Sequence, residues 1–342
     1  MKPLLKLSNN TDVYYTCLKC FSYNYFMNVI CGGRGIGKTT SFLIYGVNRV
    51  FDKNEEFIYL RRYKPEIKEF ASKDSLAPIL DGVAYKGDGN GGYTMIYENT
   101  KLGYAIPLSV TSSYKSVNFS KVGLIIYDEA ILPRGGSYHY LKNEVEMLLE
   151  FVSTVFRTRT NTRVVILGNN ADLFNPFFSY FNIPSFDGIY TDKSRGLYCE
   201  LAKNSPKLLE LEEKTPLYKL IKDTSYGEYH YDNKVLGSVD AKIIPKPSGT
   251  RLFIRLVMNY DTLNLYTYWL NGEEHLYCER REKVIDDKVT YPIMEDGNPN
   301  YYYIDLVRRK FKGYLHRLYF NKLMEFNDEK ASDIFYWIID NI

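Results

Sequence analysis

The stretch Phe26-Met-Asn-Val-Ile-Cys-Gly-Gly-Arg-Gly-Ile-Gly-Lys38-Thr39 decides the fold of this 342-residue chain. Its apolar first half predicts a buried strand, and its second half has the spacing Gly-x-x-x-x-Gly-Lys-Thr of a phosphate-binding loop. Apolar residues at helical spacing follow as far as about Val50 and predict a helix that begins at Lys38. Because such a loop turns backbone N–H groups toward bound phosphates at the start of a helix, the sequence predicts a nucleotide site here.

The residues of this loop are the expected contacts of a nucleoside triphosphate. Lys38 supplies a positive charge to the phosphate oxygens, and the hydroxyl of Thr39 is a suitable ligand for Mg²⁺. We therefore expect ATP and Mg²⁺ as cofactors. The expected nucleotide contacts are Gly32, Gly33, Arg34, Gly35, Ile36, Gly37, Lys38, Thr39 and Thr40. The alternative is a glycine turn that matches by chance, which the flanking strand and helix disfavour.

A second motif follows, Val122-Gly-Leu-Ile-Ile-Tyr127-Asp128-Glu129, and it predicts a buried strand that ends in two carboxylates. Asp128 is expected to hold Mg²⁺ through the metal's water shell, and so to contact the cofactor. Glu129 is expected to be the general base that orients the attacking water and accepts its proton. For an Asp-Glu pair alone an acidic turn after an edge strand would be the better interpretation, but the phosphate-binding loop favours the catalytic one.

Two further strands are predicted, Glu56–Leu60 between the two motifs and Thr162–Leu167 after the second. An inserted strand between the motifs, with a glutamate beside the metal-binding aspartate, resembles the additional-strand catalytic-glutamate class of P-loop NTPases, which is FtsK/HerA/terminase-like. The expected fold class is therefore α/β. In that class a polar residue at the tip of the next strand senses the γ-phosphate, and Asn169 or Asn170 is placed to do so. Asparagine after a strand is also a common turn residue.

Two arginines, Arg157 and Arg159, close a predicted helix over residues 140–156. They either complement the helix dipole or, in a ring ATPase, one of them enters the neighbouring subunit's site and stabilises transition-state charge. A second group of cations at the end of the inserted strand competes for this role, or faces a nucleotide or a nucleic-acid backbone. It is formed by Arg61, Arg62 and Lys64.

These motifs lie within segments that are similar to one known family. The segments are Gly33–Lys38, Phe57–Glu66, Ala105–Val110, Asn143–Val145, Thr154–Arg157 and Asn175–Phe178. They resemble the genome-packaging ATPases of small protein-primed tailed phages, the phi-twenty-nine-like group. The resemblance spans Tyr25 to Ile183 and thins beyond this range to Tyr226-Gly-Glu228.

The resemblance implies a homopentameric ring at the portal vertex of an empty capsid, which hydrolyses ATP to drive double-stranded DNA inward. The implied partners are double-stranded DNA, the portal or connector of the procapsid, and a structural packaging RNA, with no membrane. The implied location is the host cytoplasm, and transiently the portal vertex. In this family the C-terminal domain looks like a degenerate RNase-H-like nuclease.

The pattern of elements changes along the chain and predicts three parts. A P-loop ATPase domain is expected over residues 1–200, with a hairpin formed by 93–98 and 102–108. Residues 201–226 are expected to form a helical linker, with Pro206–Asp223 broken at Pro216. Residues 227–342 are expected to form an α+β RNase-H-like domain. Its predicted elements are strands over 252–260 and 265–270 and helices over 303–324 and 329–342.

Nuclease activity is not expected. A working RNase-H-like nuclease needs several carboxylates that converge on two metal ions from its central strands. The predicted strand Arg251–Val257 carries arginines instead, with Asp261 in the following turn and Glu273-Glu274 in a separate one.

The segment from Leu306 to Met324 contains no acidic residue and has a stripe of cations, which we call the basic stripe. Its expected nucleic-acid contacts are Arg308, Arg309, Lys310 and Lys312, followed by Arg317 and Lys322. Helical spacing places Val307, Phe311, Leu315 and Leu318 on the buried face. Such a stripe is typical of sequence-independent phosphate binding, although an ordinary solvated helix face has the same pattern.

Composition excludes several other classes. A net charge of +3 is too small to indicate a nucleic-acid binder by itself. Five cysteines with one C-x-x-C pair arrange neither a disulfide framework nor a four-thiolate zinc site, so a reduced, soluble protein is expected. No apolar run has the length of a membrane helix. Two alternatives stay open: a cellular FtsK/HerA-like double-stranded DNA pump, and an RNA-binding adaptor that uses nucleotide only as a switch.

Overall fold

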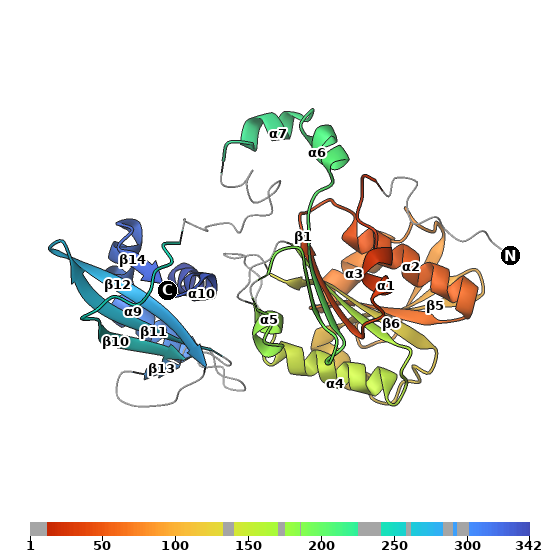
Figure 1. Cartoon of the computed structure of the whole chain (residues 1–342). Coiled ribbons are helices and arrows are strands. Elements are labelled where there is room, and N and C mark those ends of the chain that lie inside the picture. The colour runs from red at the N-terminus through yellow and green to blue at the C-terminus, as the bar shows by residue number, and fades with distance from the viewer. Residues whose placement is uncertain are drawn as a thin grey trace. The chain divides into compact units, whose positions relative to one another are not determined.

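The computed structural model describes residues 12–132, 140–169, 175–184, 186–224, 241–257, 261–282, 290–292 and 301–342 (Figure 1). These residues form two compact units. The first unit contains the described residues up to 224 except 175–184, and the second contains 175–184 and those from 241 onward. Each unit is described by itself below.

The first unit is built on a mixed sheet with the strand order β3-β4-β5-β2-β6-β7-β1-β9-β8. The strands are β1 Met27–Gly32, β2 Glu56–Arg61, β3 Val83–Gly87, β4 Tyr93–Tyr97, β5 Thr100–Pro107, β6 Val122–Ile131, β7 Arg163–Asn169, β8 Ile189–Asp192 and β9 Leu197–Ala202. The strands from β5 to β9 in this order pair in parallel, and the edges are antiparallel. Since the carboxyl ends of parallel strands meet at one edge, this edge gathers the ends of β1, β6 and β7.

The helices of the first unit are α1 Leu18–Ser22, α2 Lys38–Lys53, α3 Lys64–Ser72, the 3₁₀ helix η1 Leu108–Tyr114, α4 Glu144–Phe156, α6 Pro206–Glu212 and α7 Pro216–Ile221. Those up to α4 lie beside this sheet, whereas α7, the last one, lies away from it (Figure 1). Helix α2 extends three residues beyond the predicted Val50 and is capped by Asn54 in a left-handed conformation. Helix α4 begins at Glu144, four residues later than predicted.

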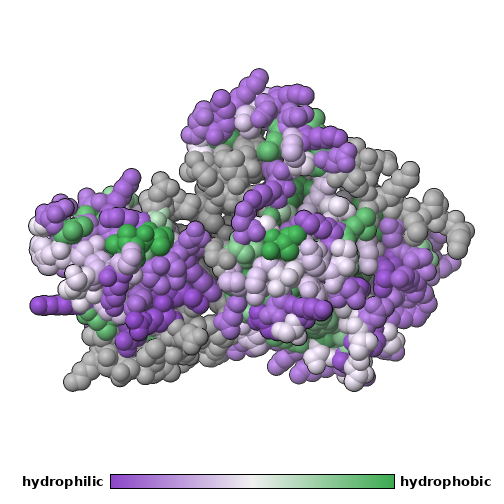
Figure 2. Space-filling view, viewed as in Figure 1, coloured by the Kyte–Doolittle hydropathy of each residue, from purple (hydrophilic) through white to green (hydrophobic). Residues whose placement is uncertain are grey.

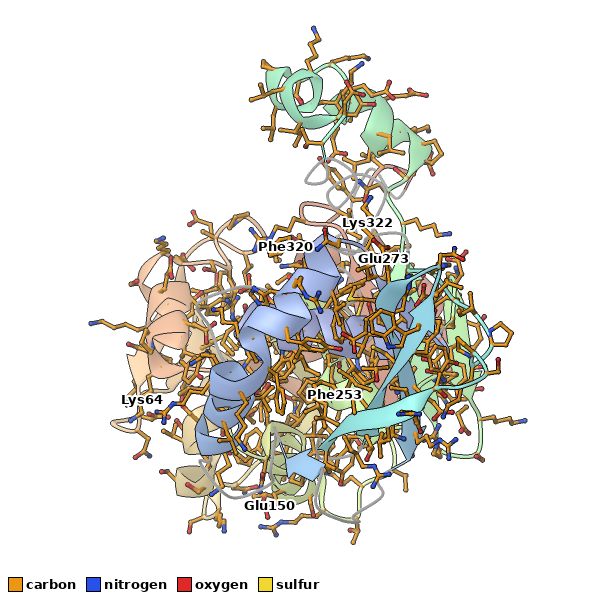
Figure 3. The ribbon with its side chains drawn as sticks, turned by 90° about the vertical axis from the view of Figure 1, so that its left-hand side faces the viewer. Lys64, Glu150, Phe253, Glu273, Phe320 and Lys322 are labelled. Carbon is orange, nitrogen blue, oxygen red and sulfur yellow. The ribbon has the colours of Figure 1, made fainter. Side chains whose placement is uncertain are left out.

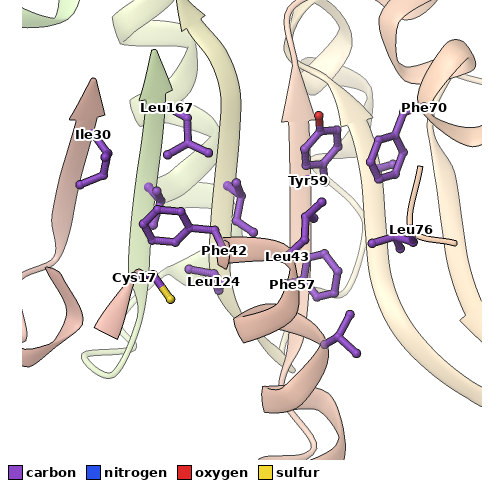
Figure 4. Close-up of a cluster of buried hydrophobic side chains, with 14 of the residues drawn as sticks. Cys17, Ile30, Phe42, Leu43, Phe57, Tyr59, Phe70, Leu76, Leu124 and Leu167 are labelled. Carbon is purple, nitrogen blue, oxygen red and sulfur yellow. The ribbon is translucent and has the colours of Figure 1, made fainter. Parts of the chain in front are cut away.

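The core of the first unit explains why these segments fold as they do. The predicted apolar face of α2 is buried, and Figure 4 shows Phe42 and Leu43 against the strands that carry Phe57, Leu124 and Leu167. Strand β1 is buried along its whole length, as a central parallel strand covered on both faces should be. This packing fixes the start of α2 directly above the end of β1.

The spatial order of the strands corrects the interpretation that Glu56–Leu60 is the strand inserted between the two motif strands. The strand between β1 and β6 in space is β7, whereas β2, the inserted strand of the sequence, pairs with the other side of β6. The resulting order β9-β1-β7-β6-β2 is that of the additional-strand class, so the predicted fold class is confirmed. The predicted hairpin is formed by β4 and β5. Strands β3, β8 and β9 were not predicted.

The second unit has a sheet with the order β13-β10-β11-β12-β14. Its strands are β10 Arg251–Val257, β11 Asp261–Leu270, β12 Glu273–Glu282, β13 Thr290–Pro292 and β14 Met324–Phe326. Its helices are α5 Pro176–Tyr180, α9 Tyr301–Phe320 and α10 Glu329–Asn341. Of the four residues predicted on the buried face of α9, Val307, Leu315 and Leu318 are buried in the core that α9 shares with α10 and the sheet. Phe311 is only partly buried against this core.

Three sequence predictions in this unit are wrong. Asp261 is the first residue of β11, and Glu273-Glu274 begins β12; neither lies in a turn. For Glu273-Glu274 the reason is a two-residue turn, Asn271-Gly272, whose φ angles of 51° and 86° are those that connect antiparallel strands tightly. Helix α9 ends at Phe320, because Met324 begins a strand that pairs with β12.

The described helices contain no apolar segment long enough to cross a bilayer. The face seen in Figure 2 is mostly hydrophilic, with small separate apolar patches.

Candidate nucleotide-binding and catalytic site

The loop between β1 and α2 has the backbone of a phosphate cradle. Gly35 and Gly37 have φ angles of +79° and +91°, which side chains with a Cβ rarely adopt. A Cβ on Gly32 would lie 2.5 Å from the carbonyl oxygen of Ala202, so β9 packs directly against the start of the loop. The backbone N–H of Tyr15 donates to the carbonyl of Ile36 over 2.8 Å and fixes the loop from outside.

Lys38 is buried at the first position of α2. Its Nζ donates to the carbonyl oxygens of Gly32 and Gly33 over 2.8 and 2.7 Å. Burial lowers the pKa of Lys38 to about 8, and the nearby Asp128 opposes part of that shift. The two carbonyls therefore accept the hydrogen bonds that phosphate oxygens would accept.

Thr39 and Asp128 bring the two sequence motifs together. The Oγ1 of Thr39 donates to Oδ1 of Asp128 over 3.0 Å, and the hydroxyl of Tyr59 donates to Oδ2 over 2.8 Å. The ring of Tyr59 stacks on Phe70, with centroids 4.1 Å apart. A hydroxyl and a carboxylate are the hard oxygen ligands that Mg²⁺ prefers, so this pair fits the expected metal.

Glu129 lies beside this pair in an unusual backbone conformation. Its φ is +50°, and its side chain is half exposed. The guanidinium of Arg61 forms an ion pair with its carboxylate, and lies 3.2 Å from Oε1 of Glu66 and 3.6 Å from Oδ2 of Asp128. Arg61 thus faces the carboxylates of the candidate site. This position favours the hypothesis that Arg61 acts at the nucleotide over the hypothesis that it contacts a nucleic-acid backbone.

The other two cations of this group have different environments. Arg62 is 1% exposed and forms a bidentate pair with Glu144, so the prediction that it binds nucleic acid is wrong. Burial prevents contact with a DNA backbone. Lys64 is exposed at the first position of α3 (Figure 3).

The two arginines after α4 are also distinct. The guanidinium of Arg159 donates to the carbonyls of Phe119, Ser120, Val122 and Val155 over 2.6 to 3.0 Å. These bonds hold it within its own subunit and contradict a role in a neighbour's site. Arg157, by contrast, is exposed directly after the last residue of α4.

Asn169 ends β7 and pairs with Gly32 in register, so it lies between the loop and the carboxylates. Asn170, the other candidate, lies outside the described residues.

Sequence reasoning missed three residues that contact this site: Tyr59, Glu66 and Glu144. Tyr59 has the pattern of one more apolar residue of β2, and the other two are glutamates at helix starts. Acidic residues at helix N-termini are common for dipole reasons alone. No local signal therefore links them to Asp128 or the arginines.

The basic stripe lies on α9 in the second unit. Arg308, Arg309, Lys310 and Lys312 are exposed, and Lys312 also donates to the main-chain carbonyl of Ile342 over 2.8 Å. Arg317 lies 3.5 Å from Glu274, and Figure 3 shows Phe320 and Lys322 near Glu273 at the same end of the unit.

The strand order, the phosphate-binding loop and the Thr39–Asp128 contact define a P-loop ATPase of the additional-strand catalytic-glutamate class. The family model of the podovirus DNA encapsidation protein (Gp16) matches residues 9–341, and the chain belongs to this family. The resemblance seen in the sequence is therefore confirmed, and the chain is a bacteriophage DNA-packaging protein.

Relatives and solved structures agree with this assignment. The DNA packaging protein of Bacillus phage phi29 is 33% identical over 263 residues, which cover 75% of this chain and 76% of the relative. That of Bacillus phage B103 is 32% identical over 276 residues, covering 80% and 84%. A chain of the bacteriophage phi29 genome packaging motor assembly matches with a TM-score of 0.63 and 25% identity over 96% of this chain and 99% of that one. The N-terminal domain of the phi29 DNA packaging ATPase matches with a TM-score of 0.50 and 31% identity over 56% and 98%.

Proposed function

We propose that this protein hydrolyses ATP and uses the energy to translocate double-stranded DNA into a preformed capsid through the portal. The observation that carries the proposal is the convergence of Lys38, the Thr39–Asp128 pair and Glu129 at one edge of the sheet, in a chain of the DNA encapsidation family.

The residues have distinct roles in this proposal. Lys38 exchanges the carbonyls of Gly32 and Gly33 for phosphate oxygens when ATP binds, and the loop amides turn toward the same oxygens. Thr39 and Asp128 would hold Mg²⁺, which when bound would neutralise charge that develops on the phosphates. Asn169 senses the γ-phosphate from the end of β7.

Glu129 acts as the general base for the attacking water. Its carboxylate is paired with Arg61, so it must leave that arginine before it can accept a proton from water. Hydrolysis therefore requires that the ion pair between Arg61 and Glu129 opens, whereas nucleotide binding at Lys38 is a separate step.

We further propose a homo-oligomeric ring, with a pentamer as the expected size, in which Arg157 acts in the neighbouring subunit's site. Its exposure at the end of α4 supports this assignment, and the four carbonyl bonds of Arg159 leave Arg157 as the better candidate.

Membership of the DNA encapsidation family supports the remaining assignments. We propose the division into an ATPase domain over 1–200, a linker over 201–226 and a C-terminal domain over 227–342. The C-terminal domain docks on the portal or a packaging RNA, with the basic stripe as its nucleic-acid contact, and has no nuclease activity. The protein works in the host cytoplasm at the portal vertex of the procapsid.

The test is a packaging assay with purified procapsids, in which packaged DNA becomes protected from added DNase. We expect protection to require ATP and to be lost with Lys38→Ala, because the shortened side chain carries no charge to the phosphates. Hydrolysis that procapsids do not stimulate would favour the cellular pump. Slow hydrolysis that ignores DNA, together with RNA binding that Lys38→Ala leaves intact, would favour the nucleotide-switched adaptor.

A further inference from the structure

Strand β6 contains an irregularity at the residues that carry the carboxylates. Tyr127 pairs with Ile166 and Ile131 with Gly168, so four steps on β6 correspond to two steps on β7. The intervening residues, 128 to 130, form a bulge, and Glu129 within it has a φ of +50°. Bulged residues lose their ladder partners, so their carbonyls need other donors if they are buried.

Arg62 supplies these donors. Its Nη1 donates to the carbonyl of Glu129 over 3.3 Å, and its Nη2 donates to the carbonyl of Ala130 over 2.6 Å. Both acceptors belong to the bulge. The guanidinium therefore replaces the hydrogen bonds that β7 does not provide. It does so on the peptide group directly after Glu129 and on the next one, and so holds the bulge that carries the Glu129 side chain.

Glu144 in turn fixes Arg62. Its carboxylate oxygens accept from Nε and Nη2 of Arg62 over 2.7 and 2.9 Å. The same carboxylate accepts from the hydroxyl of Tyr127 and the backbone N–H of Leu141, each over 2.7 Å. Both charged side chains are about 1% exposed, and Glu144 lies at the start of α4, where the helix dipole favours a negative charge.

A buried ion pair of this kind is not explained by stability alone. Removal of two charges from water costs free energy that their attraction often fails to recover, and apolar replacements are frequently as stable. The planar fork of arginine, by contrast, fixes geometry, because it offers several donors in a rigid arrangement.

We propose that Arg62, held by Glu144, is a positioning residue for Glu129, which fixes the bulge that aims the catalytic carboxylate at the attacking water. The inference rests on the proposed role of Glu129 as general base. Arg62 acts through the carbonyls of Glu129 and Ala130, and not by contact with nucleotide or water.

The first experiment measures ATP hydrolysis and nucleotide affinity of the full-length chain with Arg62→Lys. Lysine keeps the charge, but its single ammonium group cannot donate hydrogen bonds to Glu144 and to the carbonyls of Glu129 and Ala130 at the same time. We expect kcat to fall roughly ten- to a hundredfold, as for a small misplacement of a reacting group, while the Kd of a fluorescent ATP analogue changes less than about twofold, since Lys38 is untouched. In a Glu129→Gln background, Arg62→Lys should lower the residual turnover no further, because a residue that acts through a carboxylate has no effect without it.

The second experiment separates positioning from folding. The double variant Arg62→Met/Glu144→Gln removes both buried charges, and the amide oxygen introduced at position 144 leaves Tyr127 and Leu141 an acceptor. We expect its thermal midpoint to lie above that of Arg62→Met alone, which leaves the buried Glu144 charge without its partner, but its kcat to be as low as that of Arg62→Lys. Arg49→Lys is the matched control, because Arg49 also pairs with a glutamate, Glu55, beside a tyrosine ring, and belongs to α2 and not to the bulge. Its kcat should be unchanged.

The outcomes are distinguishable from those of the proposed function. Wild-type kcat in Arg62→Lys, recovery of kcat in the neutral double variant, or an equal loss in the Glu129→Gln background would each overturn the inference while Glu129→Gln alone stays inactive. Full turnover in Glu129→Gln would instead overturn the proposed role of Glu129, and this inference with it.

Discussion

The hydroxyl of Thr39 donates to the carboxylate of Asp128 over 3.0 Å, and this contact joins the first turn of α2 to β6. If Mg²⁺ is held by these two oxygens, Thr39→Ala and Asp128→Asn should each raise the Mg²⁺ concentration for half-maximal hydrolysis roughly tenfold or more. ADP binding without metal should not change. A Mg²⁺ titration of the steady-state rate measures this. Thr154→Ala, at a partly exposed threonine on α4, is the control. An unaltered Mg²⁺ requirement in the Thr39 variant would contradict the assignment.

The pH dependence of nucleotide binding should report on Lys38. Burial lowers its pKa from 10.5 to about 8, so in the free protein it loses its charge as the pH rises through 8. Bound phosphates favour the charged form, and ATP affinity should therefore be constant below pH 8 and fall above it, by up to about tenfold per pH unit. Binding titrations on both sides of this pKa measure the effect. The slope should vanish in Lys38→Ala, and a slope that persists there would assign the effect to another group.

The same shift has a consequence for stability. Between pH 8 and 10.5 the unfolded chain keeps a proton on Lys38 that the folded chain has released. This group therefore makes the folded state more stable as the pH rises through that window, and its unfavourable contribution is fully present below pH 8. Denaturant unfolding of wild type and Lys38→Met, below and within the window, isolates the contribution. Lys38→Met should be the more stable protein below the window, with a smaller difference inside it.

Arg157 and Arg159 should behave in opposite ways. In mixed rings, Arg157→Ala subunits should restore part of the hydrolysis of Lys38→Ala subunits only if the arginine acts in trans. Mixtures of two inactive variants that stay inactive at every ratio would contradict that role.

Arg159→Gln should lower the free energy of unfolding by about 1–3 kcal/mol, because it leaves buried carbonyls without donors. Its kcat per folded protein should match the wild type.

The basic stripe predicts a salt effect on nucleic-acid binding by the full-length chain. Each of Arg308→Gln, Arg309→Gln and Lys312→Gln should reduce the slope of log K against log salt by about one if that side chain contacts a phosphate. Lys73→Gln, on an exposed surface of the first unit, is the control. If all variants have the same slope of log K against log salt as the wild type, the basic stripe does not contact phosphates and is an ordinary solvated helix face.

Much of the site was predictable because its signals are local. The phosphate-binding loop needs glycines and a lysine at fixed spacing, and a buried strand that ends in Asp128-Glu129 has its own pattern. The order in which strands pair is not local. Nothing in the sequence of β7 states that it lies between β1 and β6, and the sequence interpretation took β2 as the inserted strand instead.

The errors have physical causes of the same kind. Arg61 and Arg62 are adjacent in sequence, yet alternation along the chain sends one toward Glu129 and the other into the interior beside Glu144. A residue 82 positions away therefore decides whether Arg62 is a surface cation. The start of β12 was missed for a different reason, since Asn271-Gly272 is a recognisable hairpin turn that the polar residues after it obscured.

The role of Glu129 as the general base is tested by the separation of ATP binding from hydrolysis in Glu129→Gln. Equilibrium binding and single-turnover hydrolysis are measured on the same full-length protein with Mg²⁺. We expect a Kd for ATP within about twofold of the wild type and a hydrolysis rate lower by about a hundredfold or more. Hydrolysis at the wild-type rate, with ATP bound as tightly, would contradict this role.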